Sequence, residues 1–208
     1  MAARGQGGLL SLEETGSDPL EVFERWLAEA RAGAGPDRAD AMALATAGSD
    51  GRPAARMVML RGFDRRGFVF YTNHQSRKGR QLEQNPRAAL VFHWPELHRQ
   101  VTVEGIVQRV PREESEAYFR TRPLGHRLSA WASEQDRPLP DRETLERRFA
   151  ETAERFGGDP PLPGHWGGYR LTPLAVEFWQ GREDRLHDRV RCIRSSEGEP
   201  WDAARLYP

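Results

Sequence analysis

Three side chains near the C-terminus have the types and spacing of a site for an anionic ligand. Arg185, His187 and Arg189 alternate with other residues and follow an aromatic segment that ends at Trp179. Alternate side chains of a β-strand point to the same face, so these three would form one row of two cations and a titratable imidazole. Such a row would suit an anionic, aromatic small molecule. The alternative is a solvated edge strand of alternating charge.

A second group of candidate residues lies in the segment 71–78, where a strand is predicted to end and a helix to begin. Ser76 is placed to cap that helix, and Arg77 and Lys78 follow it. Free backbone N–H groups and the positive end of the helix dipole would meet two cations there, which favours a phosphate. The alternative is an ordinary capped helix with exposed basic residues. Lys78 is the only lysine of the chain, and its placement here favours the phosphate site.

Two further arginines, Arg56 and Arg61, belong to one predicted strand. Their odd spacing would place them on opposite faces of a regular strand, because the side-chain period of a strand is two. Both could reach one ligand only if the ligand wraps around the strand or a bulge intervenes.

The composition narrows the possible functions. Lys and Arg together number 31, as do Asp and Glu, so the net charge gives no support for binding to nucleic acid or to membranes. The single cysteine, Cys192, excludes an internal disulfide and a Cys-based zinc site. The histidines are scattered and no Rossmann, Walker, zinc-protease or serine-hydrolase motif is present, so no metal site is expected. No long apolar run or signal-peptide pattern is found either, and we expect a cytoplasmic protein.

The elements that must position these residues follow a β-rich, helical, β-rich order, which predicts an α+β domain or a closed barrel with helices packed on it. Residues 1–17 are Gly-rich and polar, so we expect a flexible tail followed by a single domain over 18–208. Asp18 as N-cap and Pro19 in the first turn predict a helix that continues to about Arg31. Turn signals delimit the other predicted elements, which are strands over 42–47, 55–63, 67–72, 88–94, 100–110, 169–171, 175–179 and 189–193, and helices over 76–84, 111–120 and 142–156.

Taken in order, many blocks of the sequence resemble the pyridoxamine 5'-phosphate oxidase family, the FMN-dependent split-barrel flavoproteins. The resemblance extends over about residues 18 to 208. So many blocks in one order argue against a chance match. They include Asp50-Gly51-Arg52-Pro53, Gly67-Phe68-Val69-Phe70-Tyr71-Thr72-Asn73, Ser76-Arg77-Lys78-Gly79, Asn85-Pro86-Arg87-Ala88-Ala89, Ala130-Trp131-Ala132-Ser133, Trp166-Gly167-Gly168-Tyr169-Arg170 and the terminal Arg205-Leu206-Tyr207-Pro208.

The resemblance implies a mainly β fold with packed helices, classed as α+β and built as a split β-barrel. It implies a homodimer that holds each FMN between the subunits, with a C-terminal dimerisation region over about residues 166–208. The implied chemistry is that of an oxidase: a hydride equivalent passes from a small planar aromatic substrate to flavin N5 and then to O2, which gives H2O2.

Three sets of residues carry over from the family by their positions in this chain. The implied catalytic residues are Arg185 and His187, and the implied substrate contacts are Arg61, Tyr118, Arg122 and His126. The implied FMN contacts are Arg56, Val58, Met59, Arg61, Tyr71, Thr72, Arg77, Lys78, Gln100, Gln135, Trp179 and Arg189.

The chain departs from the family pattern where the substrate phosphate should bind. The usual lysine before the glycine of the second strand is replaced by Arg61, a cation with different geometry and reach. The serine that usually follows Arg122-Pro123 is replaced by His126. Asp136 places a carboxylate near FMN where a neutral hydroxyl is typical. The R-x-x-Y segment that covers the substrate in the family is not visible in residues 1–18.

The sequence therefore leaves three functions open. The first is a pyridoxine/pyridoxamine 5'-phosphate oxidase that makes pyridoxal 5'-phosphate. The second is a related FMN-dependent oxidase of secondary metabolism, similar to the phenazine-biosynthesis enzymes, which acts on a different planar substrate. The third is a flavin- or pyridoxal-phosphate-binding protein without turnover, against which the presence of Arg185 and His187 argues.

Overall fold

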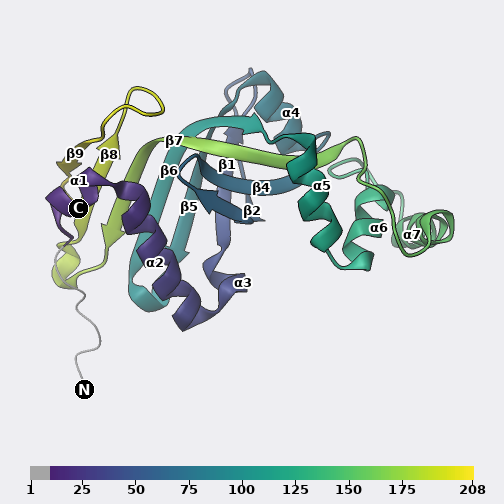
Figure 1. Cartoon of the computed structure of the whole chain (residues 1–208), viewed down its shortest axis with the longest axis horizontal. Coiled ribbons are helices and arrows are strands. Elements are labelled where there is room, and N and C mark those ends of the chain that lie inside the picture. Colours follow the sequence, from purple (N-terminus) through teal and green to yellow (C-terminus); the bar gives the residue numbers. More distant parts are fainter. Residues whose placement is uncertain (1–9) are drawn as a thin grey trace.

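The computed structural model describes residues 10–208, which form one antiparallel sheet of nine strands with helices packed on it (Figure 1). No helix in this part of the chain combines the length and the apolar character needed to cross a membrane. The helices are α1 (Leu12–Ser17), α2 (Pro19–Ala34), α3 (Pro36–Ala39), α4 (Arg77–Gln84), α5 (Arg112–Thr121), α6 (Leu124–Ala132) and α7 (Arg142–Phe156), with the 3₁₀ turns η1 (Pro95–Leu97) and η2 (Glu183–Arg185). The strands are β1 (Ala41–Ala47), β2 (Pro53–Met59), β3 (Gly62–Asp64), β4 (Gly67–Asn73), β5 (Arg87–Trp94), β6 (Arg99–Arg109), β7 (Trp166–Gln180), β8 (Asp188–Ile193) and β9 (Asp202–Arg205).

The order of the strands requires the sheet to curl. It runs β2-β1-β5-β6-β7-β4-β3, with β8 paired to β7 and β9 paired to β8. The two strands at the ends of this order, β2 and β3, are joined by Leu60 and Arg61 alone, so the sheet must bend until its edges approach each other. The backbone changes partner at this link: Leu60 N donates to Asp40 O at 2.8 Å, and Arg61 N donates to Val69 O at 2.8 Å. The single strand predicted over 55–63 is therefore wrong, because the chain passes there from one edge of the sheet to the other.

Helix α2 forms as the sequence predicts and anchors the core. The Asp18 side chain accepts the backbone N–H groups of Leu20 and Glu21 at 3.0 and 3.2 Å, which caps the helix. Phe23 is fully buried on the inner face of α2. Its ring lies 4.8 to 4.9 Å, centroid to centroid, from three aromatic rings of the sheet, and these edge and tilted contacts fix α2 across it. The three partners are Phe63, Phe68 and Phe92.

The α+β class expected from the sequence is confirmed, while several elements differ from expectation. The segments 169–171 and 175–179 belong to one long strand, β7, and the sequence did not predict α1, α3, α6 or β9. The tail expected over 1–17 is wrong for its second half, since α1 is helical and Thr15 is buried and accepts a hydrogen bond from Cys192 Sγ at 3.5 Å. The first half of that expectation, residues 1–9, lies outside the described residues.

Candidate functional site

A cleft of about 740 Å³ collects most of the residues predicted for the site. Its walls come from β2, the β2–β3 link, β4, the start of α4, the α5–α6 region and the start of β7. A volume of this size can hold a cofactor and a small substrate together. The predicted residues that line it are Arg56, Val58, Met59, Arg61, Tyr71, Thr72, Arg77, Lys78, Tyr118, Arg122, His126 and Gln135.

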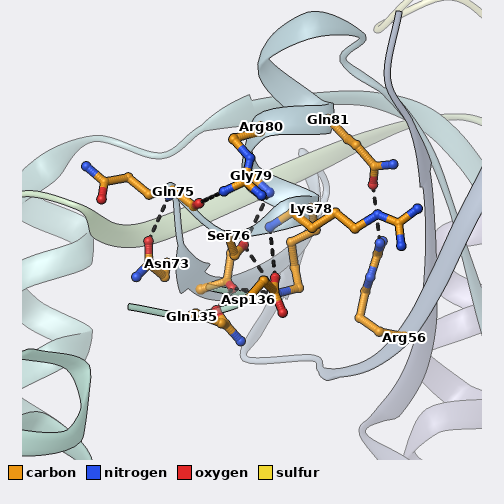
Figure 2. Close-up of polar contacts among 12 residues, drawn as sticks. Arg56, Asn73, Gln75, Ser76, Lys78, Gly79, Arg80, Gln81, Gln135 and Asp136 are labelled. Carbon is orange, nitrogen blue, oxygen red and sulfur yellow. Dashed lines mark hydrogen bonds and ion pairs between the residues drawn. The ribbon is translucent and has the colours of Figure 1, made fainter. Parts of the chain in front are cut away.

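The start of α4 presents a buried cation to this cleft (Figure 2). Ser76 caps the helix by accepting the N–H of Gly79 at 3.3 Å. Only glycine at position 79 lets the preceding loop pass so close to the helix backbone, because a Cβ there would lie 2.0 Å from the carbonyl oxygen of His74. The Lys78 side chain is only 6% exposed, and its Nζ lies 3.3 Å from Ser76 Oγ and 3.4 Å from Thr72 Oγ1. Burial lowers the pKa of the Lys78 ammonium, so an anion bound beside it would be strongly favoured.

Arg56 adds a second cation whose hydrogen bonds go to neutral groups. From β2 it donates to Leu44 O at 3.1 Å, to Thr46 Oγ1 at 2.6 Å and to Gln81 Oε1 at 3.3 Å. Burial lowers the pKa of Arg56, and the nearby charge of Arg77 lowers it further. These acceptors hold the guanidinium in place without neutralising it.

The charge balance of the cleft favours a ligand with several negative charges. Asp136 is the only carboxylate among the described residues that line the cleft. Its Oδ2 accepts the backbone N–H of Arg77 at 2.8 Å and lies 3.8 Å from Lys78 Nζ. The cations facing this single carboxylate are Arg56, Arg61, Arg77, Lys78 and Arg122.

The other part of the cleft is aromatic. Tyr71 stacks on Tyr118 with ring centroids 4.0 Å apart and on Trp166 with centroids 5.6 Å apart. Burial raises the pKa of Tyr71 to about 12, so its phenol stays neutral at ordinary pH. The Arg122 guanidinium lies 4.6 Å from the centre of the Trp166 ring. Trp166 is not among the site residues predicted from the sequence; it is buried and also lines the cleft, and its Trp-Gly-Gly-Tyr-Arg motif was the available signal.

Arg122, which lines the cleft, has a hydrogen-bond donor without a partner among residues 10–208. Its Nη1 is buried and has no hydrogen-bond partner among residues 10–208. Burial lowers the pKa of Arg122, and the nearby charge of Arg61 also lowers it. A buried guanidinium nitrogen without a partner costs free energy unless a ligand accepts from it. His126, exposed in the first turn of α6, lines the cleft close to Arg122 in sequence.

The remaining five predicted residues do not line this cleft. Gln100, Trp179 and Arg189 are neighbours across β6, β7 and β8, because Gln100 pairs with Trp179 and Trp179 pairs with Arg189. His187 joins them, with its ring centroid 4.6 Å from that of Trp179, and Arg185 is exposed in η2. Strand β8 and helices α5 and α6 lie at opposite ends of the long axis of the molecule (Figure 1). One chain therefore carries two separate groups of candidate residues.

The single row predicted for Arg185, His187 and Arg189 is wrong. The chain must turn between β7 and β8, and it does so through η2, where Asp184 and Arg185 have φ angles of 53° and 61°. Strand β8 begins only at Asp188, so the alternation of a strand does not extend back to Arg185. The turn is stabilised by backbone N–H donation from Arg182 to His187 Nδ1 at 3.0 Å.

His74, directly before α4, predicts an acid sensitivity of the fold. Burial lowers its pKa to about 4, and its Nε2 has no hydrogen-bond partner among the described residues. This value lies below the pKa of 6.5 of a histidine in the unfolded chain. The contribution of neutral His74 to the free energy of unfolding is therefore complete above pH 6.5, and it is lost as the pH falls toward 4. We expect a loss of about 2 kcal/mol in the free energy of unfolding over this range, allowing for partial solvent exposure.

Urea unfolding of wild type and His74→Gln at pH 7.5 and pH 4.5 measures this effect. The variant should lose less stability between the two pH values than wild type does. His93→Gln serves as the control, because His93 is exposed on β5. Equal pH dependence in wild type and His74→Gln would contradict the assignment.

Comparison with known proteins connects this arrangement to a family. Residues 29–156 match the family "Pyridoxamine 5'-phosphate oxidase", and residues 166–208 match "Pyridoxine 5'-phosphate oxidase C-terminal dimerisation region". The chain is 52% identical to a pyridoxine/pyridoxamine 5'-phosphate oxidase of Cupriavidus pinatubonensis, over 97% of this chain and 94% of that protein. A protein of the same name from Rubrobacter xylanophilus is 56% identical, over 95% of this chain and 91% of the relative.

A solved structure supports the same relationship. PhzG from Burkholderia lata 383, in complex with tetrahydrophenazine-1-carboxylic acid, has a TM-score of 0.89 and 34% identity, with 98% of this chain and 100% of that chain covered. A pyridoxine/pyridoxamine 5'-phosphate oxidase from the same organism is 52% identical over 92% of this chain and 89% of that protein. On these matches, which together span nearly the whole sequence, the chain belongs to the pyridoxamine 5'-phosphate oxidase family.

Proposed function

We propose that this protein is an FMN-dependent oxidase that converts pyridoxine 5'-phosphate and pyridoxamine 5'-phosphate to pyridoxal 5'-phosphate. The observation that carries the proposal is a single cleft in which two groups of cations adjoin an aromatic stack. Two ligands that each have a phosphate and an aromatic ring would fit this arrangement. A comparison of two relatives from Burkholderia lata supports this substrate. The protein named pyridoxine/pyridoxamine 5'-phosphate oxidase is 52% identical to this chain, whereas PhzG is only 34% identical.

FMN fits the part of the cleft at α4. Its phosphate would bind at the helix start, with Lys78, Arg77 and Arg56 supplying positive charge. The buried Lys78 is the strongest argument, because among residues 10–208 its Nζ has only two hydroxyls at hydrogen-bond distance. When bound, FMN accepts a hydride equivalent from the substrate and passes the electrons to O2, which yields H2O2. The further contacts from this chain would be Val58, Met59, Arg61, Tyr71, Thr72 and Gln135.

The substrate would occupy the aromatic part of the cleft. Arg122, with its unused Nη1 donor, would bind the substrate phosphate together with Arg61. The Arg122 guanidinium lies over the Trp166 ring, and this contact restricts its movement, so less conformational entropy is lost when the phosphate binds. Tyr118 would border the pyridine ring, and His126 would add a hydrogen bond or a wall at the phosphate end.

The second group of residues would complete the site of another copy. We propose that two chains form a split-barrel homodimer in which each FMN lies between subunits. The partner's cleft would then be completed by residues that lie in or beside β8, which is at the opposite end of the molecule from α5 and α6 (Figure 1); these are Gln100, Trp179, Arg185, His187 and Arg189. The family description of residues 166–208 as a dimerisation region supports this arrangement.

Complementation between two defective variants tests the shared site. Lys78→Ala and Arg189→Ala should each bind FMN weakly as homodimers. In a mixed dimer one site would receive both substitutions and the other neither, so random mixing should restore about a quarter of the sites. FMN retained after gel filtration of a co-refolded mixture measures the restoration. No restoration, or a monomer in sedimentation that still holds FMN, would contradict the shared site.

Oxygen uptake by the FMN-loaded protein tests the activity itself. Pyridoxine 5'-phosphate and pyridoxamine 5'-phosphate should each be oxidised with one H2O2 formed per O2 consumed, and unphosphorylated pyridoxine should be a poor substrate. An inactive wild type that gains activity in Arg61→Lys/His126→Ser would instead indicate an oxidase diverged toward another planar substrate. A protein that binds FMN and oxidises none of these would be a binding protein.

A further inference from the structure

The carboxylate of Asp136 lies where an anion at the start of α4 would bind (Figure 2). Its Oδ2 accepts the backbone N–H of Arg77 at 2.8 Å and lies 3.8 Å from the Nζ of Lys78. These are two of the groups that a phosphate at this helix start would need. Asp136 is thus an anion of the chain itself, held at a position suited to the cofactor phosphate.

The backbone around Asp136 directs its side chain to this position. Asp136 has a φ of 66°, a left-handed conformation that aspartate tolerates better than most residues other than glycine. The preceding residue, Gln135, is held to β4 because its Oε1 accepts from Thr72 Oγ1 at 3.2 Å. The Asp136 side chain is 41% exposed, so it has room to turn toward solvent.

We propose that Asp136 is an internal competitor of FMN that lowers the affinity of the protein for this cofactor. The proposal rests on the FMN phosphate binding at α4, as argued above. A phosphate and the Asp136 carboxylate cannot both accept the Arg77 N–H, and two anions side by side repel each other. The carboxylate must therefore turn away before the phosphate is fully bound. A serine at this position would instead offer a hydroxyl donor to the phosphate.

Flavin titrations of variants at this position test the proposal. Protein stripped of flavin is titrated with FMN and with riboflavin, and quenching of flavin fluorescence gives each dissociation constant. Asp136→Ser should lower the dissociation constant for FMN by about tenfold, because one charge-assisted contact no longer has to be broken. Riboflavin has no phosphate, so its affinity should be unchanged. FMN association, followed by stopped flow, should also be faster in this variant.

Two further variants make the result specific. Asp136→Asn keeps the shape and removes the charge, so it should also tighten FMN binding, and it replaces Asp136→Ser if that variant does not fold. Glu134→Gln removes the same charge two residues away, where the carboxylate pairs with Arg148 at 2.7 Å, and it should leave FMN affinity unchanged.

The outcomes separate this inference from the function on which it rests. FMN binding that is unchanged or weaker in both Asp136 variants would overturn it, as would an equal gain for FMN and riboflavin. If Lys78→Ala weakens FMN binding while Asp136→Ser does not strengthen it, only the role of Asp136 fails. If Lys78→Ala binds FMN as wild type does, the phosphate lies elsewhere and both assignments fail.

Discussion

Lys78→Ala is expected to weaken FMN binding by roughly ten- to a hundredfold, because it removes one charge-assisted contact to the phosphate. Arg77→Ala/Lys78→Ala should bind more weakly still. Riboflavin should bind far more weakly than FMN to wild type and should be little affected by either substitution. Flavin fluorescence titration at constant ionic strength gives all of these constants.

The size of the expected effect follows from the environment of Lys78. Its side chain is 6% exposed, and its hydrogen-bond partners are the hydroxyls of Ser76 and Thr72. A buried ammonium with neutral partners has lost most of its hydration, so a dianion beside it gains more than it would at the surface. The nearest carboxylate oxygen, on Asp136, is 3.8 Å away and does not neutralise it completely.

Arg80→Ala is the matched control for this prediction. Arg80 is a cation on the same helix, but it is exposed, does not line the cleft and donates to Gln75 O in the preceding loop. Its removal should leave FMN affinity close to that of wild type. FMN bound at wild-type strength by Arg77→Ala/Lys78→Ala would show that the phosphate does not bind at α4.

The features that could be predicted from the sequence are those determined by neighbouring residues. Asp18 and Pro19 define the start of α2, and Ser76 caps α4 as expected. Because a cap, a helix start and the cations after it lie within a few residues, local rules are enough to nominate this helix start as a candidate anion site. Local rules could not predict that Lys78 and Arg56 line the same cleft, because this depends on the pairing of strands that are distant in the sequence.

The features that could not be predicted depend on the course of the chain in three dimensions. Arg56 and Arg61 line one cleft because the backbone passes from one sheet edge to the other at Leu60, which the alternation of a single strand does not reveal. Arg185 does not lie in one row with His187 and Arg189, because the residues before Asp188 form the turn between β7 and β8. Both errors came from applying strand periodicity across a point where the chain turns.

Arg122→Gln is expected to raise the KM for pyridoxine 5'-phosphate by roughly a hundredfold, since it removes a charged donor of hydrogen bonds to the substrate phosphate. The change in kcat should be smaller, because the phosphate contact is made before and during the reaction alike. FMN affinity should be unaffected. Steady-state oxygen uptake at saturating FMN separates the two kinetic constants.

The comparison of three variants decides whether the Arg122 charge or its packing matters. Arg122→Lys keeps a charge but cannot reproduce the contact of the guanidinium with the Trp166 ring, so it should restore only part of the loss. Arg120→Gln, an exposed arginine on α5 outside the cleft, should behave as wild type. The assignment fails if Arg122→Gln weakens the binding of pyridoxal and of pyridoxal 5'-phosphate equally. A residue that binds the phosphate should affect only the phosphorylated compound. A loss confined to the phosphorylated compounds would show that the Arg122 guanidinium, one of whose nitrogens has no partner among residues 10–208, binds the substrate phosphate.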